Sequence, residues 1–341
     1  MSKGPAWSLR TSQSEMIVAV SPARQTLQIA GSSGVLIGAG ISAIANAKHR
    51  KAVMEALQGY DAGLVFEKRL HTRIREVMGA NIERVAPLGS TAGYSSVRDA
   101  ESARYAALAR NGTDLLLDLK MTYGLFGYEG TLVAKLEGGL LDIPAGRAVW
   151  RNALVVSSEP ILASNKLSDP TKRLGANLSS PRLTIEQDAI SQWTQDGGAV
   201  MRQRFEAAVG GVVSALLVDL GLVKEAEGAY YLGKQALNQK KFDKAEQHFR
   251  DALALDPGYT DAKNGLSVKQ AHSKDLDQAI ASAQAIVASS PEYGPAYFNL
   301  AWWHAVEKND LRAAKPYYNR ALLLGMPAEK KIDKLLAKNS S

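Results

Sequence analysis

The chain has 341 residues, of which 46% are hydrophobic and 22% are charged, a composition typical of a globular protein with about two domains. It contains no cysteine, which excludes disulfide bridges, thiol nucleophiles and any zinc or iron–sulfur site built on thiolates. The formal net charge of +7 is spread over both parts of the chain instead of being gathered in one run, so we expect no nucleic-acid partner.

The first two-thirds of the chain predict a tether followed by an α+β domain. Residues 1–14 are predicted to be the tether, and residues 15–222 the domain. The elements expected ahead of residue 111, in chain order, are a strand at 16–20, helices at 35–57 and 64–78, a strand at 82–86 and a helix at 98–110. The last of these helices is expected to end at Asn111-Gly112, because this pair of residues commonly closes a helix.

Apolar and polar side chains alternate from residue 115 onward, which is the pattern of strands with one buried face. We therefore predict an antiparallel meander. Residues 157–181 are rich in Ser, Pro and Asn and are expected to form a long loop, and residues 183–222 a closing helical region. The segments that carry the alternation are 115–123, 131–136, 140–143 and 148–156.

Three features of this domain resemble the soluble domains of bacterial outer-membrane lipoproteins of the curli-secretion and cell-wall-synthase-activator type. They are a glycine-rich segment at 34–40 that leads into a helix, residues 111–114 ahead of the first meander strand, and a helix led by Trp193. The resemblance implies a periplasmic protein held at the outer membrane by a lipid anchor, with Met1 in the place of the lipidated residue. The alternative is that Met1 is the natural start of a cytoplasmic protein.

The last third of the chain repeats itself at a period of about 34 residues. Phe242, Leu276 and Leu311 are one such series, and Pro257 and Pro291 follow the same step. Each period predicts two amphipathic helices joined by a polar turn, and such a pair buries its apolar stripe only by stacking on its neighbours. The third period is one residue longer, and we expect the extra residue in the turn at 307–310.

These residues resemble the tetratricopeptide repeat family. The first repeat carries its signature at Leu232-Gly233, Phe242, Ala245, Phe249, Ala252 and Pro257. The resemblance implies an all-α superhelix of three repeats at 226–259, 260–293 and 294–325, closed by a capping helix and tail at 326–341.

Repeats of this family form a concave groove that binds an extended peptide or a partner helix. Tyr230, Phe298 and Trp302 would be its aromatic anchors, although Phe298 and Trp302 have the alternative role of packing against the capping helix or the other domain. Tyr230 and Val268 stand where a carboxylate-clamping subset of the family has its clamp residues, which argues against a chaperone-tail adaptor. The positions expected to face the groove are Tyr230, Lys234, Asn238, Asn264, Val268, His272, Phe298 and Trp302.

The sequence suggests no catalytic residue, metal site or cofactor. The segment at 34–40 lacks the Gly-Lys-Ser/Thr ending of a phosphate-binding loop, the five histidines are isolated from one another, and no serine has the spacing of a nucleophile elbow.

We therefore expect a non-enzymatic envelope lipoprotein that acts as a scaffold or assembly factor through its repeat groove. One alternative is a cytoplasmic repeat adaptor or co-chaperone. A second is an enzyme with an unrecognised site in the N-terminal domain.

Overall fold

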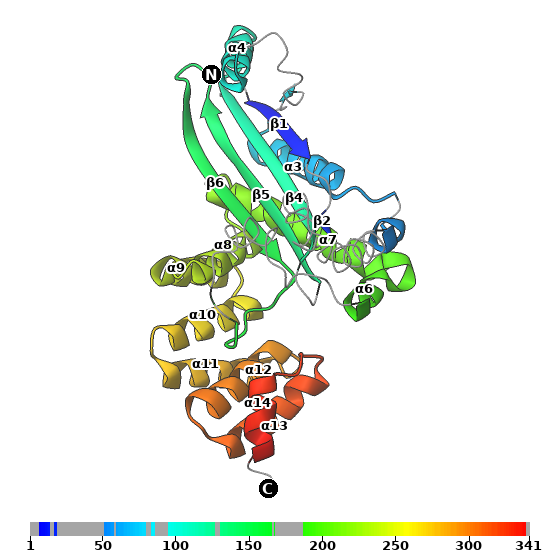
Figure 1. Ribbon diagram of the computed structural model, residues 1–341. Helices are drawn as coiled ribbons and strands as arrows, with labels where there is room; N and C mark the ends of the chain where they lie inside the picture. The colour runs from blue at the N-terminus through cyan, green and yellow to red at the C-terminus, as the bar shows by residue number, and fades with distance from the viewer. Residues whose placement is uncertain are drawn as a thin grey trace, which may run out of the picture. The chain divides into compact units, whose positions relative to one another are not determined.

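The computed structural model describes residues 7–13, 17–18, 51–57, 59–79, 83–85, 95–126, 130–165, 167 and 187–338. The chain divides into two compact units, each described here by itself. The sheet unit comprises Met1–Ser158 and Thr171–Val223, and the repeat unit comprises Glu159–Pro170 and Lys224–Ser341. The first combines a sheet with helices and the second is helical (Figure 1), so the predicted α+β fold followed by an all-α region is confirmed.

The sheet unit is built on the predicted antiparallel meander. Its strands lie in the order β3-β1-β4-β5-β6, and β2 pairs with β4 beside that path. Neighbouring strands of the meander are antiparallel, whereas β1 and β2 run parallel to β4. The strands are β1 Trp7–Gln13, β2 Ile17–Val18, β3 Glu83–Arg84, β4 Leu115–Phe126, β5 Thr131–Asp142 and β6 Arg147–Ser157.

The expected tether over residues 1–14 is wrong for residues 7–13, which form β1. Trp7 to Gln13 pair in register with Leu115 to Met121 of β4. A parallel pairing between segments so far apart in sequence depends on tertiary contacts, and the mainly polar segment carries no local signal for it.

One strand, β5, runs straight through Gly138-Gly139, where the alternating pattern suggested two shorter segments. A Cβ atom on Gly138 would lie 2.2 Å from the backbone oxygen of Asp118 on β4. Glycine therefore permits the close approach of the two strands at this point.

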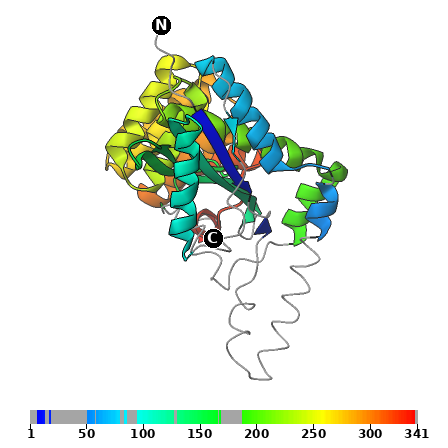
Figure 2. The same cartoon turned by 90° about the horizontal axis from the view of Figure 1, so that it is seen from above.

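Helices cover both faces of the sheet. On one face Leu108 of α4 (Val97–Arg110) packs with Leu116 and Ile143. On the other, α7 (Ala199–Asp219) packs against β5, β6 and α3 (Ala62–Met78). Seen from above, α3 and α4 lie on opposite sides of β1 (Figure 2). The predicted helices at 64–78 and 98–110 are confirmed.

The closing helical region is interrupted rather than continuous. Between α6 (Gln187–Thr194) and α7, a short 3-10 turn contains Asp196, Gly197 and Gly198 with φ angles of 50°, 62° and 73°. The two glycines adopt this left-handed backbone at little cost, which ends one helix and starts the next. Within the described residues no helix is both long and apolar enough to cross a membrane.

Some expected elements lie outside the described residues. They include the glycine-rich segment at 34–40 and residues 35–50 of the helix predicted at 35–57. The described part of that predicted helix is helical over residues 51–56. Of the predicted strand at 16–20, Ile17–Val18 is described and is a strand.

In the repeat unit, consecutive helices pair as antiparallel hairpins, α8 with α9, α10 with α11 and α12 with α13, and α14 follows them. Phe249 is fully buried between neighbouring hairpins. A Cβ atom added to Gly233 or Gly265 would lie 2.7 or 2.5 Å from its ring, so these glycines give the ring its space. The helices are α8 Ala226–Asn238, α9 Phe242–Leu255, α10 Thr260–His272, α11 Leu276–Ser289, α12 Gly294–Trp302, α13 Leu311–Leu323 and α14 Lys330–Lys338.

The turn inside each hairpin has the same backbone. Lys240, Lys274 and Asn309 occupy matching positions and have φ angles of 59°, 67° and 53°. These positions, 34 or 35 residues apart in the sequence, reproduce the repeat period in the backbone itself.

The extra residue of the third repeat lies in a helix, and its expected place in the turn at 307–310 is wrong. Trp303–Glu307 form a π-helical segment after α12, in which the amide of Lys308 donates to the oxygen of Trp303 at 2.9 Å. A π-bulge absorbs a one-residue insertion without breaking the helix, so the turn keeps its repeat geometry.

Candidate functional site: the repeat groove and its strap

The expected groove of the repeat unit holds a segment of the chain itself. Residues Glu159–Ala163, here called the strap, follow β6 in sequence but belong to the repeat unit. The strap oxygen of Ile161 accepts hydrogen bonds from Asn264 Nδ2 at 2.9 Å and from Asn299 Nδ2 at 3.3 Å. The strap amide of Ala163 donates to Asn299 Oδ1 at 2.7 Å.

The two asparagines also hold each other. Asn299 Nδ2 donates to Asn264 Oδ1 at 2.9 Å, and both side chains have no exposed surface. They project from α10 and α12, and each of their bonds to the strap ends on a main-chain atom. The pair therefore binds the main chain of the strap, which enters a turn at Ala163, where the amide of Asn165 donates to the oxygen of Leu162 at 3.1 Å.

Two adjacent aliphatic side chains anchor the strap. Ile161 and Leu162 are each 6% exposed, and they pack into different clusters. Ile161 joins the core that includes Val268, whereas Leu162 packs with Phe298 and Ala321. Successive side chains of an extended segment point in opposite directions, which accounts for the two separate clusters.

A buried ammonium group lies at the first residue of the strap. Lys234 of α8 is 8% exposed, and its Nζ donates to the backbone oxygen of Glu159. Burial lowers the pKa of Lys234 to about 8, opposed by the attraction of the Glu159 and Asp261 carboxylates. Part of the stabilisation of this buried charge thus comes from the strap.

Tyr230 belongs to the core beneath the groove. It is 5% exposed, and its ring centroid lies 5.1 Å from that of Tyr231 and 5.3 Å from that of Tyr259. Burial raises the pKa of Tyr230 well above its usual value. Its role as an anchor for an external partner stays a prediction.

Two further predicted residues lie at the margin of the strap contacts. Asn238 Nδ2 donates at 3.0 Å to the backbone oxygen of Lys234, one helical turn earlier on α8. His272 is exposed and stacks on Phe242, with 6.1 Å between ring centroids.

Trp302 contacts both the groove and the capping helix. It is partly buried and packs against the cluster that contains Ile161 and against the one that contains Ile332 of α14. Lys331 Nζ lies 5.1 Å from its ring centroid, which is a cation–π distance. The alternative role of packing against the capping helix is therefore realised for Trp302 alongside its place at the groove.

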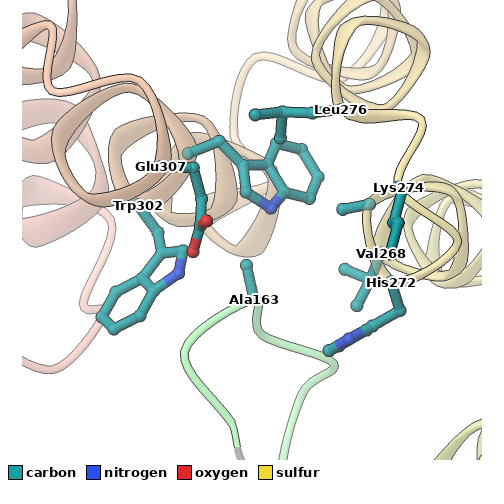
Figure 3. A pocket seen from close by; sticks show the side chains of 9 residues that line it. Ala163, Val268, His272, Lys274, Leu276, Trp302 and Glu307 are labelled. Carbon is teal, nitrogen blue, oxygen red and sulfur yellow. The ribbon is translucent and has the colours of Figure 1, made fainter.

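An open cavity of about 330 Å³ adjoins the last residue of the strap. Figure 3 shows the methyl group of Ala163 directed into it, with Trp302 and Glu307 on one side and Val268 and His272 on the other. The lining residues are Ala163, Val268, Ala271, His272, Lys274, Leu276, Trp302, Trp303 and Glu307.

Four residues of this site were not predicted from the sequence, namely Ile161, Leu162, Asn299 and Trp303. Asn299 did carry a signal, because asparagine is a poor helix former and yet stands in the middle of an apolar helix. The strap residues carried none, since nothing in a Ser- and Pro-rich segment indicates which distant surface it covers.

The sheet unit has a shallow depression of about 470 Å³, where Asp118, Glu137 and Arg151 lie around Gly138-Gly139. Lys135 pairs with Glu137 at 2.6 Å nearby. Across the described parts of the chain, no group of three or more His, Asp or Glu side chains is placed to hold a metal ion.

Comparison with known proteins gives a match in the helical region. Residues 236–302 match the family model of the tetratricopeptide repeat. The match extends from the end of α8 to the end of α12 and includes both asparagines of the groove. No curated protein matches the chain. Tetratricopeptide repeats generally mediate protein–protein interaction, and this is the role that the repeat unit supports.

Proposed function

We propose that the chain is a non-enzymatic interaction protein of the bacterial cell envelope, which captures an extended segment of a protein partner in its repeat groove. The observation that carries the proposal is the pair Asn264 and Asn299, which binds the main chain of the strap at 2.7–3.3 Å. A surface that binds main-chain atoms in this way accepts segments of different sequence.

The envelope assignment rests on the resemblance to outer-membrane lipoproteins. Two of its features have defined places in the sheet unit. Asn111 closes α4 just ahead of β4, and Trp193 of α6 donates from Nε1 to the backbone oxygen of Gly130 at 2.8 Å. A scaffold of this kind would present the repeat groove in the periplasm.

The partner is tested by photo-crosslinking in the native host. A photoreactive amino acid replaces Trp302 at the groove in one variant, and Leu255 in the control. Leu255 is 47% exposed at the end of α9. We expect a discrete protein adduct from position 302 that is absent from position 255. Adducts that are the same at both positions, or none at position 302, would contradict the proposal.

The location is tested on the product of the natural gene. Fractionation and mass spectrometry of its N-terminus should find a lipidated protein in the outer-membrane fraction. An unmodified protein in the cytoplasmic fraction would instead support the repeat-adaptor alternative. That the chain is not an enzyme stays a prediction.

A further inference from the structure

Of the last three side chains of the strap, two fill the space that the repeat unit offers them and the third does not. Ile161 and Leu162 are 6% exposed, whereas the side chain of Ala163 leaves the adjoining cavity of about 330 Å³ open. The hydrogen bond from the Ala163 amide to Asn299 fixes the backbone at this point. A larger side chain on the same backbone would therefore project into the cavity (Figure 3).

The walls of the cavity suit an aromatic ring. Trp303 is 2% exposed, Trp302 is half-buried, and Leu276 packs in the same cluster as both of them. Lys274 and Glu307 are exposed at its margin and keep it open to solvent. An aromatic side chain would gain contact area and stacking from an indole such as that of Trp302, whereas His272, Lys274 and Glu307 make the rest of the lining polar.

The π-helical segment contributes to this geometry. Leu300 marks the same repeat position as Leu266, and the extra residue comes only after it, in the π-helix Trp303–Glu307. Two consecutive indoles, Trp302 and Trp303, line the cavity just ahead of the inserted residue, at the positions where the second repeat has Val268 and Lys269.

From these contacts we infer that the external ligand of the groove is an extended peptide segment with the pattern aliphatic–aliphatic–aromatic, which displaces the strap. Its aliphatic pair takes the places of Ile161 and Leu162, and its aromatic side chain fills the cavity that Ala163 leaves open. The inference rests on the proposed function and names the chemistry of the partner. The strap is then a built-in occupant that blocks segments unable to fill the cavity.

The strap sets a threshold for such a partner. Because it belongs to the same chain, its effective concentration at the groove is on the order of millimolar. A partner with equal contacts would not displace it at cellular concentrations. One with an added buried aromatic ring gains about 10- to 100-fold in affinity over its alanine counterpart, so it competes with the strap at about 10–100 μM.

The test compares two labelled peptides, one that spans residues 157–165 and one that differs from it by Ala163→Phe. Fluorescence anisotropy measures their binding to the full chain and to a strap variant, Ile161→Ser with Leu162→Ser, after circular dichroism has shown equal folding. We expect the Ala163→Phe peptide to bind the strap variant at least about tenfold more tightly than the strap peptide. The unaltered chain should bind the strap peptide much more weakly than the strap variant does.

Two substitutions in the strap variant separate the cavity from the rest of the groove. Trp302→Ala removes a cavity wall, so it should abolish the preference for the phenylalanine peptide over the strap peptide; because Trp302 also packs against the cluster of Ile161, both peptides should bind this variant more weakly. Tyr297→Ala, on the same helix but in the cluster around Leu162, should weaken both peptides by the same factor. Equal affinities of the two peptides for the strap variant would overturn the inference. If photo-crosslinking still found a partner at position 302, the proposed function would stand with a different ligand chemistry.

Should the strap variant fail to fold, Ala163→Phe in the otherwise unaltered chain asks the same question. A ring that fills the cavity should slow hydrogen exchange of the residue 163 amide by about tenfold, because that amide is released only when the strap opens. Unchanged or faster exchange of this amide would overturn the inference.

Discussion

Replacing Asn299 with alanine removes the residue that connects the strap to two helices. Its side chain makes hydrogen bonds of 2.7 Å with the Ala163 amide, 2.9 Å with Asn264 Oδ1 and 3.3 Å with the Ile161 oxygen. After Asn299→Ala the Ile161 oxygen keeps its bond from Asn264. The Ala163 amide and Asn264 Oδ1 lose the bonds that Asn299 provided.

The cost follows from these two groups. A buried polar group that loses its partner costs about 1–3 kcal/mol. Asn264 is fully buried, whereas Ala163 is only partly so and its amide can turn to water. We therefore expect Asn299→Ala to destabilise the repeat unit by about 2–3 kcal/mol. Asn238→Ala is the matched control, since its half-buried amide bonds within its own helix and should cost less than about 1 kcal/mol.

A double-mutant cycle isolates the part of this cost that belongs to the strap. In the background Ile161→Ser with Leu162→Ser, the Ala163 amide no longer depends on Asn299, so the cost of Asn299→Ala should fall by about 1 kcal/mol or more. Hydrogen exchange of peptides from α10 and α12 measures both values in the full chain, where a single denaturation curve would mix the two units. Equal costs in the two backgrounds would refute the reasoning.

Three further predictions concern the two units separately. Gly138→Ala should destabilise the sheet unit by about 3 kcal/mol or more, because the new Cβ would lie 2.2 Å from a backbone oxygen of β4. Gly139→Ala should cost far less, because its Cβ would lie 3.2 Å from the nearest atom. Equal hydrogen-exchange rates of β5 amides in the two variants would contradict this. Lys240→Gly should stabilise the repeat unit by about 0.5 kcal/mol, because the φ angle of 59° at this position is left-handed and strains a residue that has a Cβ atom. Slower hydrogen exchange of α8 and α9 amides in the variant would show the gain, and faster exchange would argue against backbone strain. Burial lowers the pKa of His304 below 6.5, and both its ring nitrogens are buried without a hydrogen bond, so protonation favours the unfolded state. The free energy of unfolding should therefore fall as the pH drops below about 6.5, and His304→Phe should flatten this dependence. An unchanged pH dependence in the variant would contradict the assignment.

Local patterns were sufficient to predict most of the secondary structure. The 34-residue period located the helical hairpins because each repeat carries its own apolar stripe, and the alternation from residue 115 located the meander because one face of each strand is buried. The break at Asp196 to Gly198 was missed, although two consecutive glycines inside a helical pattern are a local signal for it.

What the sequence could not predict are the pairings between distant segments. Asn264 and Asn299 lie 103 and 138 residues from Ile161, whose oxygen they both bind. The pairing of β1 with β4 is of the same kind. In each case the segment is short and mostly polar or irregular, and its conformation is decided by the surface it meets. The predicted groove positions lie on α8, α10 and α12, while the strap that several of them contact was not foreseen.

Because the chain contains no cysteine, the occupancy of the groove by the strap can be tested directly. Leu162→Cys places a single thiol on the strap, where the leucine is 6% exposed, and Leu323→Cys places one where the leucine is 79% exposed. If the strap lies in the groove, a thiol reagent should modify Cys at 162 at least about 100-fold more slowly than at 323, because reaction requires the strap to open. Equal rates at the two positions would contradict the account.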